Sequence, residues 1–216
     1  MIDKQGYIFD LDGTLALSQH FHYVAYNIVL KEEGIMYTRE EDLALYAGQG
    51  SEKIFPAVFK KNGRRITAKK TLQLVHRKRE AYQELIENEP IKSVKGIIQY
   101  LEKLQKQKKK IIIATGNRRN PTEIILRKTG LQHFFPKILT IEDSKKPKPG
   151  PDIFLLALTE LQLESNQCII FEDAVNGIQA ALASGIECIG VATNVSEKKL
   201  KAAGAVKVIQ DYTELL

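Results

Sequence analysis

Three apolar runs of the sequence end in residues that could do chemistry together. Asp10 and Asp12 follow the first run, Thr115 closes the second, and Glu172 and Asp173 end the third. Carboxylates gathered at one place need a cation to organise them. Mg²⁺ is a hard cation that prefers carboxylate oxygen and shares phosphate oxygens of a substrate. If the fold brings these groups together, they suit phosphoryl transfer.

The first acidic pair supplies a nucleophile and a proton carrier. Asp10 lies at the end of the first run, where a rigid strand end could aim it at phosphorus. Asp12, two residues later, could protonate the leaving oxygen and afterwards accept a proton from water. Gly13 lets the chain turn sharply beside them. Asp10 and Asp12 could instead belong to an ordinary turn, because an Asp-Gly pair favours turns; this is the alternative interpretation.

The remaining candidates divide into metal ligands and phosphate donors. We expect Asp10, Asp173 and Glu172 to hold the metal, helped by a backbone carbonyl near Asp12. Glu172 could instead lie outside the set of direct ligands. The expected donors to the phosphoryl oxygens are Thr115, the N–H groups of Gly116 and Asn117, and the Lys148 ammonium. Thr115 could otherwise cap a helix.

Short apolar runs alternate with helical patterns through most of the chain, which predicts a parallel sheet with helices on both faces. The strand-like runs are 6–10, 110–115, 137–141, 168–173, 187–192 and 206–209. The helical patterns between them are 93–107, 121–130, 152–162 and 175–184. In such sheets, ligands bind at the carboxyl ends of the strands, where the acids lie.

Residues 16–90 interrupt this alternation with helical patterns alone, which predicts an inserted helical cap and a core of 1–15 plus 91–216. We predict one helix face from Phe21, Val24 and Ile28. A second face is predicted from Leu72, Val75, Arg79, Tyr82 and Ile86. Pro90 ends the insertion, because a residue before proline avoids helical geometry.

The composition narrows the class of protein. The chain has 216 residues and a formal charge of +6, but its dense lysine patch at 106–110 has no aromatic residue for a base to stack on. Nucleic acid is therefore not the expected partner. No stretch has the length of a membrane helix, and the start lacks a signal-peptide pattern, so we expect a cytoplasmic location. Cys168 and Cys188 lie in apolar runs and should remain thiols.

The motifs resemble those of the haloacid dehalogenase superfamily. The similar segments are Phe9–Leu15, Ile111–Thr115, Lys148–Phe154 and Phe171–Gly177, in the family's order. The match to the third motif selects Lys148 over Lys145 and Lys146. The resemblance implies a Rossmann-like fold, Mg²⁺ and an aspartyl-phosphate intermediate. An acid two residues after the nucleophile resembles the family's phosphatases and mutases.

The insertion resembles the small cap of sugar-phosphate phosphatases and of β-phosphoglucomutase. His22 and Lys78 fall where the mutase links a histidine and a lysine to its acid/base aspartate. Both could instead be surface residues of helices. The mutase has a cap arginine that grips a second phosphate, whereas the region from Gly48 to Ser51 offers Ser51 as the substrate contact.

Losing that clamp counts against a mutase, which must retain a bisphosphorylated intermediate. We therefore predict a Mg²⁺-dependent phosphatase for a small phosphorylated metabolite, of the sugar phosphate or phosphoglycolate type. A phosphomutase is the first alternative, and a non-catalytic binding protein on the same fold is the second. We expect a monomer or weak homodimer, and linkers near 15–18 and 88–92 predict that the cap acts as a lid.

Overall fold

The computed structural model describes residues 3–42 and 50–216, and this part of the chain forms two compact units. The larger unit comprises residues 1–17 and 91–216, and the smaller comprises Ser18–Pro90. The sequence analysis placed the first boundary after residue 15, whereas the units divide after Leu17. Each unit is described by itself below.

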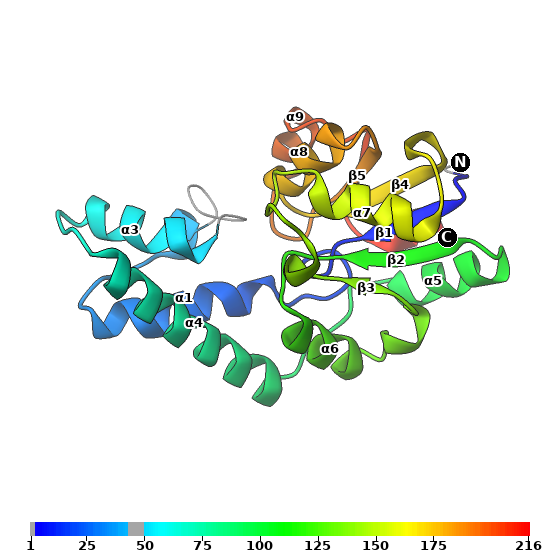
Figure 1. Cartoon of the computed structure of the whole chain (residues 1–216). Helices are drawn as coiled ribbons and strands as arrows, with labels where there is room; N and C mark the ends of the chain where they lie inside the picture. Colours follow the sequence, from blue (N-terminus) through cyan, green and yellow to red (C-terminus); the bar gives the residue numbers. More distant parts are fainter. Residues whose placement is uncertain (1–2, 43–49) are drawn as a thin grey trace. The chain divides into compact units, whose positions relative to one another are not determined.

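The larger unit is a six-stranded parallel sheet in the order β3-β2-β1-β4-β5-β6 (Figure 1). The strands are β1 (Gly6–Phe9), β2 (Lys110–Ala114), β3 (Ile138–Leu139), β4 (Cys168–Glu172), β5 (Glu187–Val191) and β6 (Lys207–Ile209). All residues of β1 and β4 are buried, as expected for strands covered on both faces. The predicted α/β fold with a parallel sheet is therefore confirmed.

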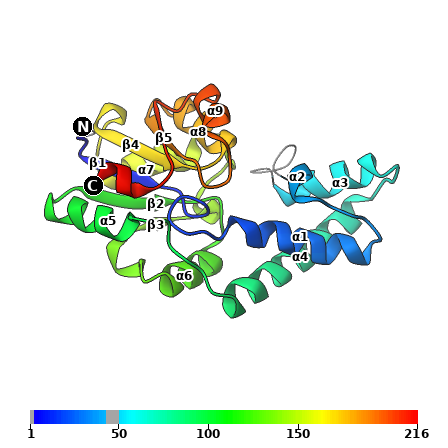
Figure 2. The ribbon, with the colours of Figure 1, turned by 180° about the vertical axis from the view of Figure 1, so that it is seen from behind.

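Helices cover both faces of this sheet, which Figures 1 and 2 show from opposite sides. One face carries α7 (Asp152–Leu161), α8 (Val175–Ala183) and α9 (Glu197–Ala202), packed on Ile8, Ile112 and Ile170. The other carries α5 (Ile97–Lys106), α6 (Arg119–Lys128) and the short 3₁₀ helix η5 (Tyr212–Leu215). The remaining short helices are η2 (Gln132–Phe134), η3 (Ile141–Asp143) and η4 (Ser165–Gln167).

The strand register places the chemistry of three strands at one sheet edge. Phe9 pairs with Ile113 of β2 and with Phe171 of β4. The residues that follow these three positions therefore lie side by side, and the N–H of Asp10 donates to the carbonyl of Phe171 at 3.0 Å. The first acid is thus fixed between two neighbouring strands by backbone hydrogen bonding.

The smaller unit consists of helices α1 (Gln19–Glu32), α2 (Arg39–Glu41), α3 (Ser51–Lys61) and α4 (Ala68–Asn88) in the described residues. Its core contains apolar side chains of α1, α3 and α4. The predicted helix faces were partly wrong, because Ile28, Leu72 and Arg79 are exposed. On α1, Ala25, Tyr26, Val29 and Leu30 are buried with Phe21, and on α4 the buried residues are Thr71, Leu74, Val75, Lys78, Tyr82 and Ile86.

Among the described residues, no helix has both the length and the apolar character required to cross a bilayer. Both cysteines are buried and unpaired with each other.

Candidate active site

Asp10, Glu172, Asp173 and Lys148 lie together at the carboxyl edge of the sheet. The Lys148 Nζ is 2.7 Å from Asp10 Oδ1 and 2.6 Å from Glu172 Oε1. It also donates to the carbonyl of Ala114 at the end of β2, at 3.0 Å. Only 8% of the Lys148 side chain is exposed. The ammonium therefore joins the ends of three strands through its three hydrogen bonds.

The three carboxylates of this cluster could hold a metal ion. One oxygen from each of Asp10, Glu172 and Asp173 lies within 4.8 Å of the other two, and all three residues are buried. A single ammonium, Lys148, contacts two of these three acids. Buried carboxylates in excess of cations are costly, and a hard divalent cation with carboxylate ligands removes that cost. The donor set therefore fits Mg²⁺.

The pKa values of the cluster show the same imbalance. Burial raises the pKa of Asp10 to about 7, although the neighbouring Lys148 ammonium acts in the opposite direction. Burial raises the pKa of Asp173 well above its ordinary value, and the carboxylates of Glu172 and Asp10 add to this effect. For Lys148, burial opposes the charged form, but the attraction of Asp10 and Glu172 outweighs it and raises the pKa. Lys148 therefore stays an ammonium ion.

Two glycines allow the backbone to pass close to the carboxylates of the cluster. Gly13 has a φ of 76°, and a Cβ built there would lie 2.1 Å from Asp173 Oδ2. A Cβ on Gly177 of α8 would lie 1.9 Å from the carboxyl carbon of Glu172. The turn after β1 and the helix after β4 therefore approach the acids more closely than any other residue type permits.

Asp12 belongs to a second group of contacts, at the end of β2. Its Oδ2 accepts a hydrogen bond from Asn117 Nδ2 at 2.5 Å, and both residues are buried. The backbone N–H of Asn117, predicted as a phosphate donor, here donates to Thr115 Oγ1 at 3.1 Å. Gly116 is exposed, and a Cβ built on it would meet open space. Thr115 and Asn117 thus connect the second motif to the second acid of the first.

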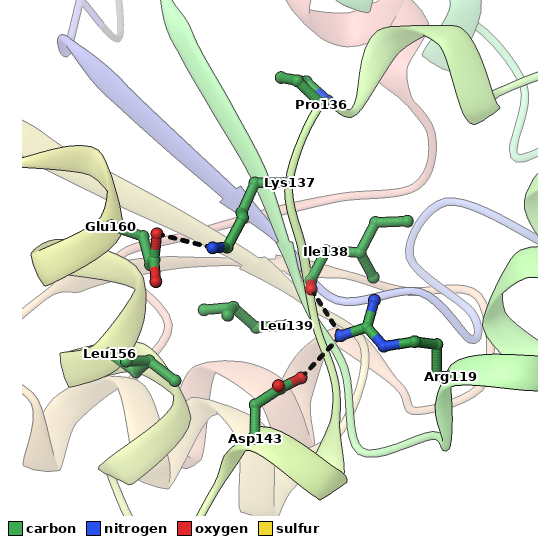
Figure 3. A pocket seen from close by; sticks show the side chains of 8 residues that line it. All are labelled: Arg119, Pro136, Lys137, Ile138, Leu139, Asp143, Leu156 and Glu160. Carbon is green, nitrogen blue, oxygen red and sulfur yellow. Dashed lines mark hydrogen bonds and ion pairs between the residues drawn. The ribbon is translucent and has the colours of Figure 1, made fainter.

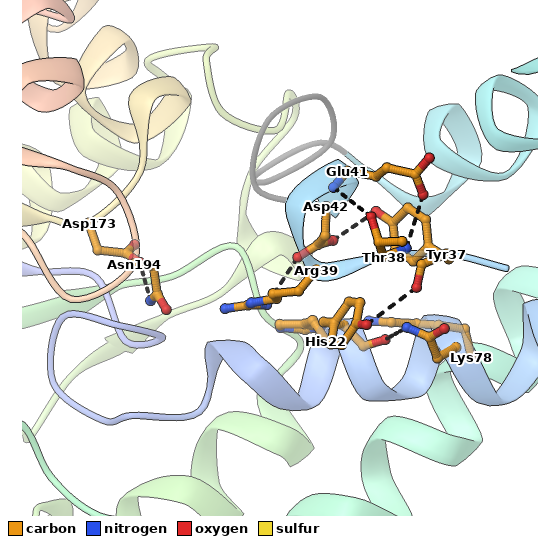
Figure 4. A network of polar contacts seen from close by, with 11 residues as sticks. His22, Tyr37, Thr38, Arg39, Glu41, Asp42, Lys78, Asp173 and Asn194 are labelled. Carbon is orange, nitrogen blue, oxygen red and sulfur yellow. Dashed lines mark hydrogen bonds and ion pairs between the residues drawn. The ribbon is translucent and has the colours of Figure 1, made fainter.

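The sequence analysis missed two site residues, Thr193 and Asn194, in the segment that follows β5. Asn194 donates from Nδ2 to Asp173 Oδ2 at 2.9 Å (Figure 4), and Thr193 donates from Oγ1 to the carbonyl of Gly13 at 2.6 Å. A signal for them was present, because polar residues directly after a strand of a parallel sheet lie at the same edge as the other strand ends.

The cap candidates His22 and Lys78 contact each other within the helical unit (Figure 4). His22 Nδ1 is 2.6 Å from Lys78 Nζ, and the imidazole stacks on the ring of Tyr82. The ammonium lies 4.8 Å from the ring centroids of both Tyr26 and Tyr82. A protonated Lys78 would donate to Nδ1 of a neutral His22 whose own proton is at Nε2. Neither residue is a simple surface side chain.

Ser51 begins α3, and its hydroxyl lies 2.6 Å from the hydroxyl of Tyr26. Burial raises the pKa of Tyr26, so this phenol stays protonated. The segment predicted to surround Ser51 includes Gly48 and Gln49, which lie outside the described residues.

A cavity of about 430 Å³ occurs elsewhere in the larger unit, next to β3 (Figure 3). Its lining side chains include two ion pairs, Lys137 with Glu160 and Arg119 with Asp143, each at 2.9 Å. None of the predicted site residues lines it. Because its charges are paired with each other, we assign the chemistry to the acidic cluster.

Comparison with known proteins gives one family. Residues 7–191 match the family model described as haloacid dehalogenase-like hydrolase. The fructose-1-phosphate phosphatase YqaB of Escherichia coli is 30% identical over 188 residues, which cover 86% of this chain and 95% of that protein. The β-phosphoglucomutase of Bacillus subtilis is 31% identical over 187 residues, covering 85% and 81%.

A solved structure has the same fold. The HAD hydrolase of family IA, variant 3, from Entamoeba histolytica gives a TM-score of 0.87 at 25% identity, covering 98% of this chain and 95% of that chain. The similarity therefore spans nearly the whole length of both chains.

Proposed function

Because the chain belongs to the haloacid dehalogenase-like hydrolase family, we propose that it hydrolyses a small sugar phosphate through a phosphorylated Asp10. The observation that carries this proposal is the buried group formed by Asp10, Glu172, Asp173 and Lys148. It combines a nucleophile on a strand end, a carboxylate set for Mg²⁺ and an ammonium for phosphate.

In the first step, a carboxylate oxygen of Asp10 attacks phosphorus and the bond from phosphorus to the sugar oxygen breaks. Asp12 gives its proton to the departing oxygen, and the sugar leaves as an alcohol. In the second step, water attacks the phosphorus of the aspartyl phosphate and gives a proton to Asp12. The bond between phosphorus and Asp10 breaks, which releases inorganic phosphate and restores both acids.

Charge stabilisation comes from groups around the phosphoryl oxygens. Lys148 lies against Asp10, where its ammonium can attract the phosphoryl group that Asp10 receives. Bound Mg²⁺, held by Asp10, Glu172 and Asp173, would offset the repulsion between the nucleophile and a phosphate dianion. Thr115 and the N–H of Gly116 remain our candidates for further phosphate contacts.

We extend the proposal to the helical unit, which would select the substrate. Its polar groups His22, Lys78 and Ser51 contact aromatic side chains of the same unit. Ser51 is neutral, so it cannot replace the bidentate clamp that a second phosphate requires. This favours hydrolysis over transfer between two positions of a sugar.

The test is phosphate release from fructose 1-phosphate, glucose 1-phosphate and phosphoglycolate, with Mg²⁺ or with EDTA. We expect Mg²⁺-dependent release from at least one sugar phosphate, lost in Asp10→Asn and retained in the control Asp3→Asn. Conversion of β-glucose 1-phosphate to glucose 6-phosphate with a bisphosphate activator, without phosphate release, would establish the mutase instead.

A further inference from the structure

The side chain of Asn117 has a contact that the catalytic scheme above does not use. Its amide Nδ2 lies 2.5 Å from Asp12 Oδ2, and the two residues are 9% and 7% exposed. The sequence analysis considered only the backbone N–H of Asn117. That N–H is bonded to Thr115 Oγ1, so the side chain of Asn117 has a role separate from its backbone.

The backbone of Asn117 is held on both sides. Its N–H donates to Thr115 Oγ1 at 3.1 Å, and its carbonyl accepts from the N–H of Ile141 at 3.0 Å. Ile141 begins η3, whose first turn is closed by hydrogen bonds from Thr140 to Asp143. The amide therefore projects toward Asp12 from a backbone with little freedom to move.

The turn that carries Asp12 is also fixed, but through its backbone. The N–H of Gly13 donates to the carbonyl of Ala16 at 2.7 Å, and the carbonyl of Gly13 accepts from Thr193 at 2.6 Å. These bonds locate the Cα of Asp12 without fixing the torsions of its side chain. A carboxylate only accepts hydrogen bonds, so Asn117 presents its NH₂ group to Asp12 and not its side-chain carbonyl. The bond is charge-assisted and therefore among the stronger kinds.

We propose that Asn117 is a positioning residue that holds the Asp12 carboxylate in the orientation for proton exchange with the leaving oxygen. This inference rests on the proposed function, because it needs Asp12 to be the acid and base. Asn117 acts through Asp12 and does not itself touch the reacting atoms. A displacement of about 1 Å in a catalytic group can cost about 100-fold in rate.

The test exploits the leaving group. An alkyl phosphate requires a proton on its leaving oxygen, whereas nitrophenolate leaves with little help. Asn117→Ala keeps the backbone N–H and removes only the amide. In single-turnover experiments, we expect it to slow phosphorylation of the enzyme by fructose 1-phosphate about 10- to 100-fold. With p-nitrophenyl phosphate the loss should stay within about threefold, and KM should change little for either substrate.

A double-mutant cycle separates positioning from a general structural role. In an Asp12→Asn background, Asn117→Ala should cause no further loss, because the group that it positions is already gone. The control Asn120→Ala, an exposed residue of α6, should match the parent enzyme. Equal losses on both substrates, or additive losses in the cycle, would overturn the inference. If Asn117→Ala does not fold, Asn117→Ser, whose side chain is too short to reach Asp12, gives the same readout.

The two proposals fail in different ways. If Asp12→Asn retains full activity on fructose 1-phosphate, the role of Asp12 in the proposed function is wrong. If Asp12→Asn is impaired but Asn117→Ala equals the parent on both substrates, only the positioning role of Asn117 is wrong.

Discussion

Lys148 of the sheet unit and Lys78 of the helical unit both have side chains with little exposed surface, but their surroundings differ. In the sheet unit, Lys148 contacts the carboxylates of Asp10 and Glu172. In the helical unit, Lys78 lies over the rings of Tyr26 and Tyr82 and beside the imidazole of His22. Within the described residues, Lys148 therefore makes ion pairs, and Lys78 makes cation–π contacts.

This difference indicates what each site is built to receive. The sheet unit has more buried carboxylates than ammonium groups in its cluster, so we expect it to bind a divalent cation and, with that cation, a phosphate. In the helical unit, the described contacts of Lys78 are with two aromatic rings and the imidazole of His22. Changes in the first site should therefore stop the chemistry, and changes in the second should alter the choice of substrate.

The largest effect should come from Lys148→Ala. This change removes the only side-chain cation that contacts Asp10 and Glu172 in the described structure, together with its stabilisation of the phosphoryl group. We expect kcat for sugar phosphate to fall about 1,000-fold. The matched control is Lys145→Ala, an exposed lysine three residues earlier, which should stay within about twofold. More than a tenth of the parent rate in Lys148→Ala would show that the ammonium is not needed.

A smaller effect is expected from Gly177→Ala. The new Cβ would overlap the carboxyl group of Glu172, so this side chain or α8 must move. The Mg²⁺ concentration for half-maximal activity should rise about 10- to 100-fold, the range seen when groups that orient metal ligands are lost. Gln179→Ala, at an exposed position of the same helix, is the control. An unchanged Mg²⁺ requirement would show that Glu172 does not bind the metal.

The third prediction concerns stability against pH without metal. The pKa of Asp10 rises from an ordinary 3.8 to about 7 in the fold, so between these values the folded protein keeps a proton that the unfolded chain has lost. The free energy of unfolding in EDTA should therefore fall as the pH rises through this window. We expect Tm to drop by several degrees between pH 4 and pH 7.5, less in Asp10→Asn.

Added Mg²⁺ should reverse this loss in the parent protein at pH 7.5, because it binds the ionised acids of the folded state. Thermal melts of both proteins, with EDTA or Mg²⁺, measure this. Identical pH profiles for the parent and Asp10→Asn would contradict the expected penalty at Asp10.

The smallest effect on chemistry should come from Lys78→Met. Met has an apolar side chain of similar length, so the change removes the ammonium and keeps most of the buried volume. We expect phosphorylation by p-nitrophenyl phosphate to stay within about threefold of the parent, while kcat/KM for the sugar phosphate falls about 10-fold. Lys69→Met, at an exposed position of α4, is the control. Equal losses of activity on both substrates would contradict the division of roles, in which the sheet unit carries out the chemistry and the helical unit selects the substrate.

The sheet unit could be predicted closely from the sequence. Its strands are continuous apolar runs, and a polar residue directly after such a run must lie at the ligand-binding edge. This rule found Asp10 and Thr115 and could also have found Thr193, which directly follows the predicted run 187–192. It could not reveal that the amide of Asn117 faces Asp12, because that contact depends on the exact path of the chain after β2.

The helical unit was harder to predict for a physical reason. On α4, Leu72 and Arg79 match the helical period, yet both are exposed, whereas Lys78 is buried. Periodicity identifies a helix but not the partner that each face meets. Burial of a lysine depends on aromatic rings contributed by two helices, here Tyr26 of α1 and Tyr82 of α4. That information is absent from any single segment.

The most direct test of the account is to trap the phosphorylated enzyme. The enzyme is mixed with ³²P-labelled substrate and Mg²⁺, quenched in acid within milliseconds, and digested to locate the label. We predict that the label is on the peptide containing Asp10, that it disappears when excess unlabelled substrate is added before the quench, and that it is absent in Asp10→Asn. Turnover with no labelled protein, or with the label on another residue, would contradict the central role of Asp10.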